Sequence, residues 1–391
     1  MKKLQQTRQK HILNLMIKKS ILFLCLGVFI LGCKTAQNKN KTLLFVGSFT
    51  DKKPGEGINI YEFNTETGET KLTFTLDSIT NTSFLKISND GNNLYSVVDS
   101  QMKYNGKVAS FQIDVLNSKI NLMDLKDCGG INPAHLDIDK TGNYLANSNY
   151  SDGSLSLFKI HKDGKLSEAK HVLQFKDSSI IKSRQQSSHI HSSNFSPDNK
   201  YLFSHDLGAD KIRQFTFDKS QEQLKNPQEV RTNLGNGPRH LTFHPNGLYG
   251  YGVNELSGTI DAYHYKKGTL TFIEDYQTYQ QKQDIYRAAD IHISSDGNFL
   301  YASNRSPEED SIAVFSIDKK NGKLQLIEHV NTGGNHPRNF AISPNEGFLL
   351  VANQFTNNIT IYKRDAKTGK LTKLPHQIKV NSPSSIQMYT Y

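Results

Sequence analysis

Several residue types and patterns that mark other architectures are absent from this sequence. It contains no tryptophan, which argues against a WD-repeat scaffold. No segment of useful length shows heptad or 3.6-residue apolar spacing, so helices do not organise the chain. A Gly-x-Ser-x-Gly elbow, a phosphate-binding Walker loop and a dinucleotide-binding glycine motif do not occur in a suitable context. The serine-hydrolase and nucleotide-binding classes that use these motifs therefore receive no support.

The excess of basic residues gives little information about partners. The formal net charge of +10 at pH 7 would favour nucleic acid or an anionic surface if it were spread over the chain. Residues 1–33 hold six basic and no acidic residues, which leaves 41 Lys and Arg against 37 Asp and Glu, a net charge of +4. Lysine-rich segments such as 318–323 fit hairpin turns. We expect no nucleic-acid partner, and no feature indicates a protein partner.

The apolar run Ile21–Leu31 is too short to span a membrane. Such a helix needs roughly 20 residues. The run follows Lys18 and Lys19 and ends at Gly32 and Cys33, which is the order of parts in a secretion signal. A cysteine directly after the apolar run, preceded by a small residue, is typical of a lipoprotein signal. An ordinary secretory peptide cleaved nearby is the alternative.

This signal predicts an exported lipoprotein of a bacterial envelope, anchored in a membrane and facing the periplasm. Residues 1–33 would be the signal peptide, Cys33 would carry the lipid, and residues 34–41 would form a polar tether. Translation from Met16 would still leave a complete signal. Cys128 would then be the one free cysteine of the mature chain, so no intramolecular disulfide can form and stability must come from burial.

Residues 42–391 contain an internal repeat of about 50 residues. Each copy has a short apolar strand, a turn rich in Asp, Asn and Gly, a second strand of the type YLYxxN, a polar loop and a third, alternating strand. A fourth strand follows, as in residues 323–330. Four antiparallel strands make one blade of a β-propeller. The copies cover residues 84–114, 134–160, 193–218, 239–265, 289–318 and 338–365.

Six copies and two partial ones predict an all-β, seven-bladed β-propeller. Residues 42–50 match a second strand with no first strand before it, and residues 383–389 match a first strand with nothing after it. Strands from both termini would complete the seventh blade and leave no open sheet edge. We therefore expect one propeller domain over residues 42–391.

The repeat brings unusual polar residues to one mouth of the central channel. First and second strands are antiparallel, so the start of the first and the end of the second lie at the same rim. Taken singly, most such residues are structural, but a histidine, arginines and a carboxylate that converge can perform acid–base chemistry on an anionic substrate. The residues at these positions are His135, Asn149, His189, His191, Asp206, Arg239, Glu255, Asp290, Arg305, Arg338 and Asn353.

His189 and His191 have the spacing of a metal-binding pair, because alternate residues share one face of a strand. Zinc sites need three or four protein ligands, and no third ligand is visible in the sequence. We therefore expect neither a metal nor another cofactor.

Five segments of the repeat carry a specific pattern. They are NPAHL (132–136), RQQSSHIHSSNFSPDNKYL (184–202), GPRHLTFHPNGLYGYGVNEL (237–256), AADIHISSDGNFLYASNR (288–305) and HPRNFAIS (336–343). The pattern resembles the propeller-type lactonase family, which includes 6-phosphogluconolactonases and a fungal carboxy-muconate lactonising enzyme. The similarity extends from about residue 42 to the C-terminus. One departure is the pair Ser187-Ser188, where family members often have Pro or Gly-Cys.

The resemblance implies a lactonase that opens a sugar-type lactone by adding water. Its catalytic residues would be one histidine, two arginines and a glutamate, which fall on His191, Arg239, Arg305 and Glu255. Either His191 or Glu255 would accept the proton of water, while the arginines would stabilise the oxyanion and hold an anionic group of the substrate. Other rim residues would contact the substrate, namely His135, His189, Asp290, Arg338 and Asn353.

Two other functions remain open. One is a non-catalytic propeller that binds a sugar acid or a protein partner at the same mouth. A muconate-type lactonising cycloisomerase would use the same residues on another substrate. The export signal is a further departure from the family pattern, because the phosphorylated lactone of the pentose phosphate route is cytoplasmic.

Overall fold

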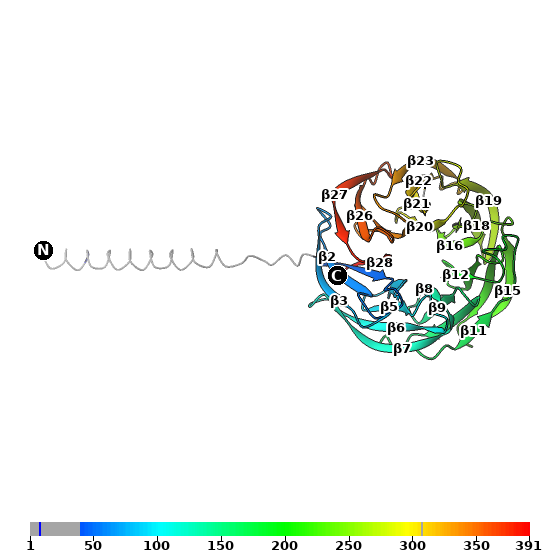
Figure 1. Cartoon of the computed structure of the whole chain (residues 1–391), viewed down its shortest axis with the longest axis horizontal. Helices are drawn as coiled ribbons and strands as arrows, with labels where there is room; N and C mark the ends of the chain where they lie inside the picture. The colour runs from blue at the N-terminus through cyan, green and yellow to red at the C-terminus, as the bar shows by residue number, and fades with distance from the viewer. Residues whose placement is uncertain (1–7, 9–39, 306–307) are drawn as a thin grey trace. The chain divides into compact units, whose positions relative to one another are not determined.

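Seven four-stranded antiparallel sheets form a ring within residues Lys41–Tyr391 (Figure 1). The computed structural model describes residue 8, residues 40–305 and residues 308–391. From Lys41 onward the described residues contain no helix, and nowhere in the described chain is a helix long and apolar enough to cross a bilayer. The expected signal peptide, Cys33 and most of the expected tether lie outside the described residues.

Six of the seven blades are continuous in sequence, and their strands follow one another from the channel to the periphery. Blade 2 contains β4 (Leu85–Ile87), β5 (Asn93–Val98), β6 (Asn105–Asp114) and β7 (Lys119–Ile131). Blade 3 contains β8 (Pro133–Ile138), β9 (Tyr144–Asn149), β10 (Ser154–Lys159) and β11 (His171–Gln174). Blade 4 contains β12 (Ile190–Phe195), β13 (Tyr201–Asp206), β14 (Lys211–Asp218) and β15 (Gln223–Arg231).

The remaining continuous blades have the same order. Blade 5 contains β16 (Pro238–Phe243), β17 (Tyr249–Asn254), β18 (Thr259–Lys266) and β19 (Thr269–Gln277). Blade 6 contains β20 (Ala288–Ile293), β21 (Phe299–Asn304), β22 (Ser311–Ile317) and β23 (Leu324–Asn331). Blade 7 contains β24 (Pro337–Ile342), β25 (Phe348–Asn353), β26 (Asn358–Arg364) and β27 (Leu371–Lys379).

Blade 1 joins the two ends of the propeller. Its inner strand is β28 (Pro383–Thr390), followed outward by β1 (Thr42–Ser48), β2 (Ile58–Phe63) and β3 (Thr70–Leu76). Thr42 is paired with Thr390, and their hydroxyl oxygens lie 2.8 Å apart. The prediction of a seven-bladed propeller closed by strands from both termini is confirmed.

The turn between the first two strands of a blade is set by its polar residues. In blade 3, Oδ1 of Asp139 accepts the backbone N–H groups of Asn143 and Tyr144 at 2.8 and 2.9 Å. Gly142 in the same turn has a φ of 73°, a left-handed conformation that glycine adopts without steric cost. The repeated Asp, Asn and Gly residues therefore fix each hairpin, and with it the ends of the inner strands.

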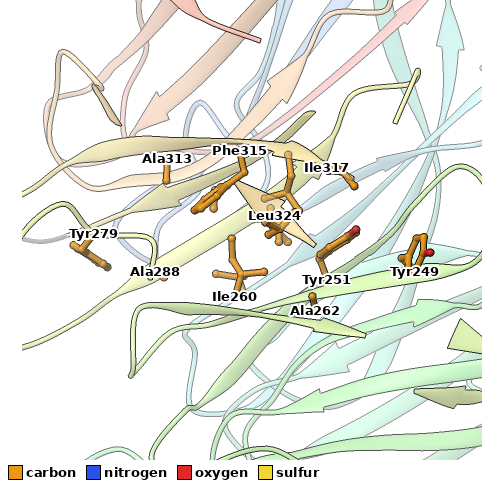
Figure 2. Close-up of a cluster of buried hydrophobic side chains, with 14 residues drawn as sticks. Tyr249, Tyr251, Ile260, Ala262, Tyr279, Ala288, Ala313, Phe315, Ile317 and Leu324 are labelled. Atoms are coloured by element: carbon orange, nitrogen blue, oxygen red, sulfur yellow. The ribbon is translucent and has the colours of Figure 1, made fainter. Parts of the chain in front are cut away.

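The hydrophobic core lies between the blades. Each of the seven buried apolar clusters joins two neighbouring blades, so the ring is closed by packing as well as by β28. In the cluster of Figure 2, Tyr251 and Ile260 of blade 5 pack with Phe315 and Leu324 of blade 6. Truncating a buried phenylalanine such as Phe315 to alanine typically costs about 3–5 kcal/mol of stability.

Tyrosine hydroxyls form hydrogen bonds between neighbouring blades. The tyrosine of the second strand donates to the carbonyl oxygen of a turn glycine in the following blade, at 2.9 Å in three cases. A buried phenolic hydroxyl needs such an acceptor, since an unpaired one is costly. These hydrogen bonds hold the blades in a fixed relation around the channel. The pairs are Tyr95 with Gly164, Tyr251 with Gly322 and Tyr301 with Gly369.

Candidate active site

A β-bulge lies near the start of the inner strands. In five of them the register skips one residue between the first and third strand positions. A bulged residue has no partner on the neighbouring strand, and its side chain is turned out of the regular alternation. The skipped residues are Ala134, His191, Arg239, Arg338 and Ser384.

These bulged residues line a small cavity inside the ring, which has space for about one water molecule. We call them, with their equivalents Ser83 in blade 2 and Ala289 in blade 6, the channel positions. Four of the seven channel positions hold Ser or Ala, whereas blades 4, 5 and 7 hold His191, Arg239 and Arg338. Small residues in four blades leave room for three large polar side chains from the others.

A second set of residues follows directly after the second strands. We call them the rim positions, and three of them contact channel positions. Glu255 binds Arg239, the ring of Tyr150 lies 5.5 Å from that of His191, and the guanidinium of Arg338 lies 5.2 Å from the centroid of Phe49. The seven rim positions are Phe49, Asp99, Tyr150, Leu207, Glu255, Arg305 and Gln354.

Glu255 is buried and accepts hydrogen bonds from three guanidinium groups. Its Oε1 atom lies 2.5 Å from Nη2 of Arg184. Its Oε2 atom lies 3.0 Å from Nε of Arg239 and 2.8 Å from Nη2 of Arg305. Burial alone would raise the pKa of Glu255, but the charges of the three arginines outweigh burial and hold this pKa well below its usual range. Glu255 is therefore an ionised anchor for the arginines, and both of its oxygens are occupied.

Arg239 is held on two sides and open on a third. Its Nη1 atom donates to the carbonyl oxygen of Ala289 and, at 3.2 Å, to Nε2 of His240. His240 in turn donates from Nδ1 to Oδ1 of Asp290 at 2.8 Å. Burial and the charge of Arg239 lower the pKa of His240 to about 4, so this imidazole is neutral. Within the described structure Nη2 of Arg239 has no hydrogen-bond partner, and Arg239 lines the cavity.

His191 combines burial with an unused nitrogen. Burial and the nearby charge of Arg239 hold the pKa of His191 well below its usual value, so the ring is neutral. Among the described residues its Nδ1 atom has no hydrogen-bond partner. The rings of Tyr150 and His240 lie at 5.5 and 5.2 Å and fix its orientation. His191 lines the cavity, and a neutral imidazole can accept a proton.

Arg305 differs from Arg239 because all three of its guanidinium nitrogens are engaged. Its Nε atom donates to the carbonyl oxygen of Arg287 at 3.0 Å, and Nη2 binds Glu255. Its Nη1 atom lies 3.3 Å from Nε2 of His336. Arg305 is therefore placed to orient Glu255 and its neighbours.

Comparison with known proteins agrees with this geometry. Residues 43–388 match the family model described as "Lactonase, 7-bladed beta-propeller". The chain belongs to this lactonase family. The curated 6-phosphogluconolactonases of Formosa agariphila and Bacillus subtilis share 54% and 32% identity with this lactonase, over 89% of its length and 99% and 98% of theirs. A solved structure of a periplasmic gluconolactonase from Pseudomonas aeruginosa has a TM-score of 0.83 at 29% identity and covers 89% of this chain and 99% of its own. The predicted family and the predicted lactonase are confirmed.

The structure brings His191, Arg239, Glu255 and Arg305 of this lactonase together, with Arg338 on the same cavity wall. Asp290, which was assigned to the substrate, has both carboxylate oxygens engaged by protein groups. Oδ2 of Asp290 binds Nε2 of His292 at 2.9 Å and also accepts from the amide of Asn339.

His135, His189 and Asn353 are not among the residues that line the cavity. The ring of His135 packs against Phe84 and His240 at 4.4 and 5.3 Å. His189 stacks on the ring of Tyr150, and its Nδ1 atom lies 2.9 Å from the carbonyl oxygen of the same residue. Asn353 is fully buried and donates outward, to the carbonyl oxygen of Thr332 at 3.2 Å. The geometry therefore gives these side chains a supporting place in the lactonase.

Sequence reasoning missed several residues of the site. Arg184 lies in the long loop before β12 and was quoted within a family segment without a role, although it binds Glu255. Phe49 and Tyr150 are rim positions that an alignment of the blades one residue beyond the second strand would have found. Among the described residues, no group of three or more His, Cys, Asp or Glu side chains is arranged to hold a metal ion.

Proposed function

We propose that this protein hydrolyses a sugar-type lactone of the 6-phosphogluconolactone class at the mouth formed by the channel and rim positions. The observation that carries the proposal is that the neutral imidazole of His191 and the guanidinium of Arg239 line the same cavity. The names of the relatives, 6-phosphogluconolactonase and gluconolactonase, support the class of substrate.

In the proposed reaction His191 acts as the general base. Water adds to the lactone carbonyl carbon, and the imidazole of His191 takes one of its protons. Collapse of the tetrahedral oxyanion breaks the ring C–O bond, and His191 returns its proton to the ring oxygen, which becomes a hydroxyl group. The product is an open-chain hydroxy acid. General-base assistance of this kind typically contributes about 10²–10⁴-fold to the rate.

Arg239 is the proposed donor to the oxyanion. Its position is fixed by Glu255 and by His240, so the open Nη2 edge needs little reorganisation when negative charge develops. Glu255 was the other candidate base, but its two oxygens are occupied by three guanidinium groups. This occupancy supports the role of Glu255 as the charge that holds the arginines together. Since the cavity is no larger than a water molecule, the sugar ring would lie across its mouth.

The test is a panel of 6-phosphoglucono-δ-lactone, glucono-δ-lactone and muconates, with acid release followed at neutral pH above the spontaneous rate. We expect turnover of a sugar lactone by the wild type and a loss of about 10²-fold or more in kcat for His191→Asn. His161→Asn, at an exposed histidine in the turn after β10, is the matched control. Saturable binding of the sugar acids without turnover would favour a non-catalytic propeller, and conversion of muconates alone would favour a cycloisomerase.

We also propose that the protein is exported and anchored in a membrane through lipid on Cys33. The support is the order of Lys18 and Lys19, the apolar run Ile21–Leu31 and Gly32 before the cysteine. A periplasmic gluconolactonase among the similar solved structures is consistent with such a location. The small-molecule lactone and the membrane are the two partners that this proposal contains.

A further inference from the structure

We propose that Arg338 selects lactones that carry a phosphate or carboxylate group at the end remote from the reacting carbonyl. The inference rests on the proposed hydrolysis and names the substrate class more narrowly. In this proposal Arg338 binds the anionic group of the substrate, and Arg239 donates a hydrogen bond to the oxyanion.

The position of Arg338 is the first support. It is the bulged residue of β24, equivalent in the repeat to His191 and Arg239. The other four channel positions hold Ser or Ala, so the blade architecture does not require a large cation there. Arg338 also lines the same cavity as His191 and Arg239, so the three side chains lie at the same mouth.

The second support is that Arg338 lacks the carboxylate partner that other arginines inside this ring have. Arg239 and Arg305 bind Glu255, Arg213 binds Asp206, and Arg364 binds Glu346. Within the described chain the guanidinium of Arg338 has no hydrogen bond and no ion pair. Burial and the charge of Arg305 lower the pKa of Arg338 to about 10, which leaves it protonated at neutral pH without a carboxylate in direct contact. An anionic ligand would supply that contact.

The third support is the charge balance around the cavity. Four guanidinium groups, from Arg184, Arg239, Arg305 and Arg338, face the carboxylates of Glu255 and Asp290. Since His191 and His240 are neutral, the site carries excess positive charge. Such a site attracts and orients an anionic substrate.

The ring of Phe49 orients the guanidinium of Arg338. The ring of Phe49 is buried and lies 5.2 Å from the guanidinium carbon of Arg338, in a cation–π arrangement. Contact with a ring face leaves the N–H edges of a guanidinium free. A planar guanidinium presents these donors as a fork that matches two oxygens of a phosphate or carboxylate.

The experiment compares kcat/KM for 6-phosphoglucono-δ-lactone and glucono-δ-lactone in the wild type, Arg338→Met and Arg338→Lys. We expect Arg338→Met to lower the ratio of the two values by roughly 10–100-fold, with the neutral lactone changed by less than about threefold, and Arg338→Lys to recover part of the ratio. Arg231→Met, at an exposed arginine at the end of β15, is the control. An unchanged ratio, or an equal loss on both substrates, overturns the assignment.

Calorimetry separates this inference from the proposed function. The ligands are 6-phosphogluconate, glucarate and gluconate, which end in a phosphate, a carboxylate and a neutral hydroxyl group. The inference is supported if the wild type binds 6-phosphogluconate or glucarate more tightly than gluconate and Arg338→Met loses this preference. The ligand that is preferred identifies the anion. If no lactone is hydrolysed but this binding pattern holds, the proposed function fails and the assignment of Arg338 stands. Equal binding of all three ligands overturns the assignment even if hydrolysis is observed.

Discussion

Glu255 accepts a 3.0 Å hydrogen bond from Nε of Arg239, and the two residues belong to the same blade. One follows the second strand and the other occupies the bulge of the inner strand. The contact therefore joins a rim position to a channel position, and it leaves Nη1 of Arg239 for His240 and Nη2 for a ligand.

Replacing Glu255 by Gln should lower both activity and stability. The change leaves three buried or partly buried guanidinium groups without their shared charge, and breaking a buried ion pair typically costs about 3–5 kcal/mol. Because the pKa of Glu255 is lowered on folding, its contribution is fully present above its ordinary value near 4.5 and is lost as the pH falls through the lowered value. Urea unfolding should therefore show a stability difference between wild type and Glu255→Gln at pH 7 that narrows under strongly acidic conditions. A difference that is the same at every pH would contradict the assigned charge state.

The pH profile should reveal the state of His191. Burial and the charges of Arg239, Arg338 and Arg305, together with His240, lower its pKa, so it stays neutral and able to accept a proton well below pH 6.5. We expect kcat/KM for a neutral lactone, which reports on the free enzyme, to remain level as the pH falls through 6.5. An acid limb centred near 6.5 that disappears in His191→Asn would show that this histidine titrates normally.

Asp290 should act as a positioning residue through His240. Its Oδ1 atom fixes the ring so that Nε2 faces Nη1 of Arg239. Asp290→Asn removes the charged acceptor while keeping the shape of the side chain. We expect kcat to fall roughly tenfold with KM nearly unchanged, because the loss falls on transition-state stabilisation. Asp284→Asn, at an exposed residue of the loop before β20, is the control. A rise in KM alone would instead indicate direct contact with the substrate.

Replacing Cys33 by Ala should abolish the proposed lipid anchor. Stable attachment to a membrane needs more than one acyl chain, so the native protein is expected in the membrane fraction and the variant in the soluble fraction or as unprocessed precursor. Fractionation and N-terminal sequencing provide the measurement. Native protein found in the cytoplasm with its first residues intact would contradict export.

The sequence was sufficient to predict the number of blades and their closure, and to bring His191, Arg239, Glu255 and Arg305 to one mouth as a candidate site. The repeat of turn residues and apolar alternation specifies hairpins locally, and hairpins determine which strand ends share a rim. The exact residue at which each second strand ends was harder to predict. Asn149 and Asn353 end their strands and turn their amides outward, whereas the next residue in each blade occupies the rim. A shift of one residue in a strand exchanges the two faces, so the rim positions could not be separated from their neighbours by spacing alone.

The sequence also could not predict which arginine nitrogens are engaged by protein groups. The family pattern points equally to Arg239 and Arg305, but Arg305 is engaged at every nitrogen by groups that include His336 and the carbonyl oxygen of Arg287. Arg184 reaches Glu255 from 71 residues away in sequence. Such contacts arise from the fold of loops, for which no periodic pattern exists.

Closure by the last strand has a consequence for how the protein is made. Ser384 of β28 lines the cavity, and the backbone N–H of Ile386 donates to Oδ1 of Asn339 at 2.6 Å, whose amide in turn binds Asp290. A nascent chain therefore has no complete site until β28 has been translated. A chain truncated before β28 should be inactive and should expose the inner sheet edge at β1, so catalytic activity also reports that β28 has been made and paired.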